Sequence, residues 1–133
     1  MSQEYDTYAY YWVRGFECNH SNISEALNLQ PTTIKVKGEE SKHIKGRNIK
    51  ENVWQFHSSL PRTETFQDAH LVKLLESLLP RKSEILALNK KFESGINCVG
   101  YYTNSHPGFH LSSKLLSNLA KLELDIDFDL YNY

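Results

Sequence analysis

Apolar and acidic residues alternate without interruption over residues 124–130 of the sequence. A β-strand turns successive side chains to opposite faces, so this segment is predicted to be a strand with one apolar and one acidic face. We expect the acidic face to point outward, because neighbouring carboxylates repel one another and are costly to bury. Open solvent, a cation or a basic partner all suit such a row. The apolar face holds Leu124, Ile126, Phe128 and Leu130, and the acidic face holds Asp125, Asp127 and Asp129.

The size and charge of the chain limit the class of protein. With 133 residues and 40% hydrophobic content, residues 1–133 are expected to form one domain with a real core. The 15 basic and 16 acidic residues give a net charge of -1, without the basic excess of a generic nucleic-acid-binding protein. No apolar run reaches the roughly 20 residues of a membrane helix, and the polar start is unlike a signal peptide. We therefore expect a cytoplasmic protein that binds neither nucleic acid nor membrane.

Strand and helix patterns alternate along the rest of the chain. Asn22 and Glu25 have the spacing of a capping box, which predicts a short helix beginning near residue 22. Leucine spacing predicts a helix that Pro80 ends, a second helix after it, and a third that Ser112 caps. The predicted order is βαββααβαβ. Its strands are expected at residues 8–16, 33–37, 53–59, 96–103 and 124–133.

Several local strings, taken in order, resemble an uncharacterised, mainly bacterial family known as domain of unknown function 4279. This resemblance spans nearly the whole chain. It implies an α+β fold: a two-layer sandwich with a mostly antiparallel sheet of about five strands and helices on one face, ferredoxin-like with an added helix and strand. It implies no activity and no catalytic residues. The matching strings include Gly15, residues 23–27, Pro31, Thr32, Gly38, Trp54, His70, Leu71, Leu74, Leu75, Leu119, Ala120 and residues 125–131.

The first strand has one face of large side chains and one of smaller ones. If helices cover only one side of the sheet, the smaller set packs under them and the larger set faces outward. That outward row would share a face with the acidic row, and exposed aromatic rows of this kind usually mark protein contacts. The alternatives are that the row is core, or that the C-terminal segment covers it. The candidate partner surface is Tyr8, Tyr10, Trp12, Arg14, Asp125, Asp127 and Asp129.

The residues that commonly carry chemistry form no complete constellation. Cys18 with His20, and His106 with His110, lack partner pairs at zinc-site spacing. Cys18 and His20 are the one pair suited to a nucleophile, but no third residue orients them. We therefore predict no catalytic, metal or cofactor site. Residues 35–50 form a locally basic stretch, which is interpreted as a solvated hairpin or as a contact for an anion or an acidic partner.

Three functional hypotheses follow from these observations. The first is a cytosolic protein-interaction module, of the kind a toxin-neutralising immunity protein would be, which binds a protein partner or a second copy of itself. The alternative is a small-ligand sensor or regulatory domain that dimerises. The least favoured is a small enzyme that uses Cys18 and His20, or a divalent ion on the aspartates. We favour the interaction module, because the sequence offers a candidate contact surface and no complete catalytic set.

Overall fold

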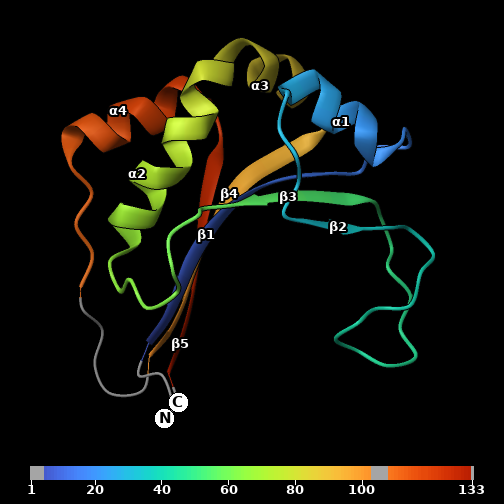
Figure 1. Ribbon diagram of the computed structural model, residues 1–133, viewed down its shortest axis with the longest axis horizontal. Coiled ribbons are helices and arrows are strands. Elements are labelled where there is room, and N and C mark those ends of the chain that lie inside the picture. The colour runs from blue at the N-terminus through green and yellow to red at the C-terminus, as the bar shows by residue number, and fades with distance from the viewer. Residues whose placement is uncertain (1–4, 103–107, 133) are drawn as a thin grey trace.

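The computed structural model describes residues 5–102 and 108–132, arranged as Figure 1 shows. The elements follow the predicted order, with a short 3-10 helix between the second and third helices. They are β1 (Tyr5–Arg14), α1 (His20–Leu27), β2 (Thr33–Lys35), β3 (Val53–His57), α2 (Gln67–Leu78), η1 (Leu79–Arg81), α3 (Lys82–Asn89), β4 (Glu93–Tyr102), α4 (Ser113–Lys121) and β5 (Asp125–Asn132).

Within the described residues the strands form one sheet in the order β2-β3-β1-β4-β5. β1 is antiparallel to both of its neighbours, β3 and β4, and β2 is antiparallel to β3. β1 and β2 therefore run in the same direction with β3 between them, which is the split βαβ unit of a ferredoxin-like sandwich. β5 joins β4 in parallel, because α4 carries the chain back along the sheet. The α+β sandwich with an added helix and strand is confirmed, and its sheet is mixed.

The helices lie on one face of the sheet, and the core fills the space between the two layers (Figure 1). Alternate residues of β1 enter this core, as the strand pattern predicted. None of the described helices is both long enough and apolar enough to cross a membrane. The largest fully buried side chains include Trp54, Tyr11, Tyr102, Phe16, Ile23, Leu27, Leu71, Leu74, Leu78 and Ile85.

Helix α1 begins earlier than the capping-box spacing predicted. Its N-cap is Asn19, whose side chain makes no capping hydrogen bond, so Asn22 and Glu25 both lie inside the helix. The other end is held by a residue distant in sequence. The guanidinium of Arg81 donates from Nε to the carbonyl oxygen of Leu27 (2.7 Å) and from Nη2 to that of Asn28 (2.9 Å). These charge-assisted bonds satisfy carbonyls that a helix C-terminus otherwise leaves without partners.

Two other predicted helix boundaries are confirmed. α2 ends at Leu78, before Pro80, and the chain continues through η1 into α3. The hydroxyl of Ser112 accepts a hydrogen bond from the backbone N–H of Leu115 at 3.1 Å and caps α4. Proline and a capping serine act locally, so both signals can be read from the sequence.

Candidate functional site

One face of the sheet carries no helix in the described chain (Figure 1), and we call it the open face. Ala9, Tyr11 and Val13 are fully buried under the helices, so the alternate residues of β1 point the other way. The interpretation in which the large row of β1 forms the core is therefore wrong. β5 does not cover that row either, because it lies beside β4 at the edge of the sheet. The row on the open face is Tyr8, Tyr10, Trp12 and Arg14.

The acidic row of β5 lies on the same face. Asp127 is the β5 partner of Asn97, which in turn is the β4 partner of Tyr10. Directly paired residues point to the same face of a sheet, so Asp125 and Asp129, two positions to either side of Asp127, share it as well. The structure thus brings all seven residues of the candidate surface together.

The apolar row of β5 is covered less completely than its pattern predicted. Leu124 and Ile126 pack against the core, but Phe128 and Leu130 remain 42% and 37% exposed. The ring of Phe109 contacts that of Phe128, with centroids 6.0 Å apart. β5 is the last strand of the described sheet, so no further described strand shelters its outer side.

A stack of aromatic rings crosses the middle of the open face. The imidazole of His57, on β3, lies against the ring of its cross-strand partner Tyr10 at a centroid distance of 4.7 Å. Tyr8 stacks on His57 at 5.8 Å, and the Arg62 guanidinium lies 3.9 Å from the Tyr8 ring centroid. Neither His57 nor Arg62 is marked by a local pattern, because both join the site through long-range pairing.

Two tyrosines extend the aromatic surface toward the acidic row. The rings of Tyr101 on β4 and Tyr131 on β5 are cross-strand partners and stack with centroids 4.8 Å apart. Tyr101 is half-buried and Tyr131 is 47% exposed. The open face therefore carries aromatic rings on strands β1, β4 and β5, which gives it a broad apolar surface beside the aspartates.

Hydrogen bonds hold the central side chains of this face in place. The indole Nε1 of Trp12 donates to Oδ1 of Asn97 (3.0 Å), whose Nδ2 contacts the Tyr10 hydroxyl (2.9 Å). The Arg14 guanidinium lies 4.7 Å from the Trp12 ring centroid, and its Nε donates to Glu93 at 2.7 Å. Burial raises the pKa of Tyr10, an effect that the Asn97 bond partly opposes. The phenol therefore stays neutral at physiological pH.

A hollow of about 490 Å³ lies where β1, β4 and the start of β5 meet. The side chain of Trp12 forms an apolar part of the wall of this hollow. The charged side chains that line it are four carboxylates and one guanidinium. Its charged lining residues are Arg14, Glu93, Glu123, Asp125 and Asp127. Since Arg14 already pairs with Glu93, the carboxylates nearest β5 give the hollow a negative potential.

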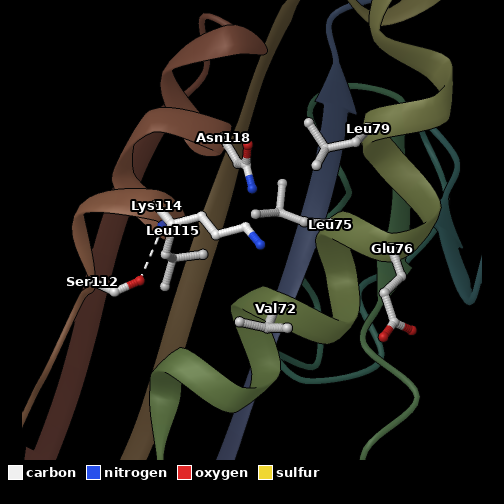
Figure 2. Close-up of a pocket in the computed structure, with 8 residues that line it drawn as sticks. All are labelled: Val72, Leu75, Glu76, Leu79, Ser112, Lys114, Leu115 and Asn118. Atoms are coloured by element: carbon white, nitrogen blue, oxygen red, sulfur yellow. Dashed lines mark hydrogen bonds between the residues drawn. The ribbon is translucent and has the colours of Figure 1, made fainter.

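A second hollow, of about 310 Å³, lies between α2 and α4 on the opposite side of the molecule (Figure 2). Val72 and Leu75 of α2, with Leu79 of η1, face Leu115 of α4 across it, so its floor is apolar. The side chains of Lys114 and Asn118 extend from α4 into the space between the helices (Figure 2), whereas Glu76 and Ser112 lie at its margins. One ammonium group and one amide above an apolar floor make no catalytic set, so the groove is not part of the candidate site.

The cysteines and histidines have structural surroundings. Nε2 of His20 lies 2.8 Å from the backbone oxygen of Lys35, which occupies one imidazole nitrogen, and Cys18 is exposed. Cys98 is buried in β4, where desolvation raises the pKa of its thiol to about 12. Among residues 5–102 and 108–132 no group of three His, Cys, Asp or Glu side chains could hold a metal. His106 lies outside the described residues.

The basic stretch forms part of a long irregular hairpin beside β2. A bridge between Glu40 and Asn48 closes it, and Oε1 of Glu40 accepts a hydrogen bond from the Gly46 N–H at 2.9 Å. A hollow of about 600 Å³ lies between this hairpin and β2. Its lining mixes basic side chains with the carboxylates of Glu39, Glu40 and Glu51, which oppose the binding of an anion, so the hollow is not part of the candidate site.

Replacing Gly95 should test how the open face is held together. A Cβ at Gly95 would lie 2.8 Å from the indole of Trp12, its cross-strand partner, and 3.2 Å from the backbone oxygen of Asp125. We therefore expect Gly95→Ala to displace the indole and break the Trp12 to Asn97 hydrogen bond, at a cost of roughly 1–2 kcal/mol. Indole N–H chemical shifts and urea unfolding measure both effects. An unchanged indole resonance would contradict this expectation.

The stability of the fold should depend on pH through His57. Burial, with a smaller contribution from the Arg62 charge, lowers the pKa of His57 from 6.5 to about 4. Between these values the unfolded chain binds a proton that the folded chain does not, so stability falls as pH falls from 6.5 through 4. A His57→Gln variant should lose less stability across this window, as measured by urea unfolding. Titration of the His57 ring protons near pH 6.5 would contradict the expected shift.

No curated protein and no solved structure matches the chain. One protein-family model does match, over residues 4–133. That match covers essentially all of the sequence, including both strands of the candidate surface. The resemblance noted from the sequence is thereby confirmed: the chain belongs to the family described as Domain of unknown function (DUF4279).

Proposed function

We propose that this protein is an interaction module that binds one protein partner through its open face. The observation that carries the proposal is a set of aromatic and arginine side chains fixed by hydrogen bonds and ring stacking, on a sheet face that no described helix covers. Tyr, Trp and Arg are the residue types that dominate binding energy at protein interfaces. Because these side chains are already held in place, binding costs them little conformational entropy.

The charge of the face supports a basic protein as the partner. The row Asp125, Asp127 and Asp129 lies beside the aromatic rings, so an incoming surface meets apolar rings and carboxylates together. Phosphate groups would be repelled by this row, whereas lysine and arginine side chains would be attracted to it. Such charge complementarity raises the association rate and excludes acidic competitors.

The form of action that we propose is neutralisation of a toxin, as an immunity-type protein performs it. Covering a partner needs a complementary surface and no catalytic group, and the open face offers such a surface. We also propose that the protein acts in the cytosol. Cys18 and Cys98 are free thiols, which is the usual state of cysteine in a reducing compartment.

Capture of partners from the protein's own cells tests the proposal. Tagged wild type is compared with Trp12→Ala and with a triple Asp125/Asp127/Asp129→Asn variant, and the bound proteins are identified by mass spectrometry. Loss of a central tryptophan should weaken binding of a specific partner roughly thirtyfold. The matched control is Leu116→Ala, which removes a large exposed side chain from α4 on the helix layer. Equal capture of the same proteins by all variants would refute the proposal.

Photo-crosslinking then locates the contact on the molecule. p-Benzoylphenylalanine replaces Tyr10 on the open face or, as the control, Val72, which is exposed on α2. We expect position 10 alone to crosslink to the captured partner. A crosslink from position 10 only to a second copy of the chain would contradict a separate partner and favour self-association.

A further inference from the structure

Within the described residues, β5 is the last strand of the sheet and pairs on one side only. It pairs with β4 along its length, from Asp125 to Asn132, and no other described strand lies beyond it. In a parallel pair, every second residue of a strand turns both its N–H and its C=O toward the partner strand. The residues between them turn their N–H and C=O groups the other way, which in β5 is toward the free edge. Such an edge is a template for pairing with another extended segment.

The two faces of this edge differ in chemistry. On the open face, β5 carries the acidic row Asp125, Asp127 and Asp129. On the helix side, it carries the exposed side chains of Phe128 and Leu130. Phe109, which contacts Phe128, is itself 45% exposed and widens the apolar side. An added strand would therefore meet carboxylates with one set of its side chains and apolar groups with the other.

Charge decides what kind of strand can pair there. If a second copy of the chain placed its β5 against this one in the same sheet, the two acidic rows would lie side by side and repel each other. A strand with lysine or arginine at alternate positions instead meets each aspartate with an opposite charge, because cross-strand Cβ atoms lie about 5 Å apart. The acidic row thus acts against self-pairing and for a basic partner.

We propose that β5 receives an extended segment of the partner in which lysine or arginine alternates with apolar residues, and that this segment adds a sixth strand to the sheet. The basic side chains pair with the acidic row, and the first of them reaches the hollow beside Trp12 and Asp125. The apolar side chains cover Phe128 and Leu130. This inference rests on the proposed function and specifies how the partner is recognised.

The probe is an eight-residue peptide of alternating lysine and valine, blocked at both ends and labelled for fluorescence anisotropy. Two controls keep its length: one places all the lysines before all the valines, and one replaces lysine with glutamate. Two further peptides carry N-methyl groups, either on every lysine amide or on every valine amide. Strand addition uses only one of these two sets of amides, so only one N-methylated peptide should lose binding.

Protein variants separate the edge from general charge attraction. The triple Asp125/Asp127/Asp129→Asn variant should bind the alternating peptide about tenfold more weakly, from three cross-strand charge pairs. The matched control is Glu25/Glu76/Glu84→Gln, which makes the same change of net charge at exposed positions on the helices. This control should bind as wild type does. In the bound protein, amide hydrogen exchange should slow at every second residue of β5.

Specific results would overturn the inference. Equal binding of the block and alternating peptides, or of both N-methylated peptides, would show attraction by charge without strand addition. No binding of the alternating peptide would also overturn the inference. If the captured partner still depends on Trp12 in any of these cases, the proposed function stands and only the mode of recognition fails. If β5 binds the peptide but partner capture ignores Trp12, the proposed function fails and the edge site stands.

Discussion

Trp54→Ala is expected to remove roughly 3–5 kcal/mol from the free energy of unfolding, which is much of the stability of a typical domain. The indole of Trp54 is fully buried, packs edge-on against Tyr11 with centroids 6.0 Å apart, and donates from Nε1 to the Ser24 hydroxyl at 3.0 Å. Alanine would leave a cavity between β3 and α1. It would also remove the N–H that donates to the buried Ser24 hydroxyl, leaving that hydroxyl only its long bond to the carbonyl oxygen of His20 (3.5 Å).

The matched control is the other tryptophan of the chain. Trp12 lies on the open face and is half-buried, so Trp12→Ala should cost about 1 kcal/mol, mainly from its hydrogen bond to Asn97 and its contact with Arg14. Urea unfolding followed by far-ultraviolet circular dichroism gives both values on one scale. A larger loss for Trp12→Ala than for Trp54→Ala would reverse the assignment of core and open face.

Gly100→Ala should have the second-largest effect, about 1–3 kcal/mol of destabilisation. The ring of Tyr102, two residues along the same strand, folds back over Gly100, and a Cβ there would approach its Cζ to 2.6 Å. Tyr102 is fully buried, so its ring has no free space to move into. The backbone of Gly100 has no positive φ, so the cost arises from packing alone.

A double-mutant cycle tests this cause. Tyr102→Leu removes the ring from above Gly100, and alanine at position 100 should then cost less than it does beneath tyrosine. The expected coupling between the two substitutions is roughly 1–2 kcal/mol, measured by urea unfolding. If the losses of unfolding free energy from the two substitutions simply add in the double variant, the Tyr102 ring is not the cause of the cost of alanine at position 100.

The alternation of side chains made the two faces of β1 and β5 predictable. In β1, Tyr11 is buried and Tyr10 is not, as the period of two requires. The same period placed Asp127 opposite the core. The buried face of a strand fixes which of its side chains point away from the core. When two strands of one sheet both alternate strongly, the side chains that point away from the core must therefore share one face, even before the pairing of the strands is known.

Other parts of the site depend on contacts that no local pattern encodes. His57 stacks on Tyr10 only because β3 lies beside β1, and 46 intervening residues carry no sign of that pairing. α1 begins at His20 rather than near Asn22, and Nε2 of His20 lies 2.8 Å from the backbone oxygen of Lys35, a contact that the local capping pattern does not encode. The exposure of Phe128 goes with the place of β5 at the edge of the described sheet, which the alternation within β5 does not encode.

The central strand of the sheet is also the first of the described strands to leave the ribosome. Arg14 of β1 pairs with Glu93 of β4, 79 residues later in the chain. At roughly 5–20 residues per second of synthesis, one edge of an aromatic strand stays open for about 4–16 s. Asp6 and Arg14 bound this aromatic run, and charges at the ends of an apolar strand act as gatekeepers against aggregation. In the nascent chain, the charge of Arg14 would oppose aggregation of this strand until β4 is made.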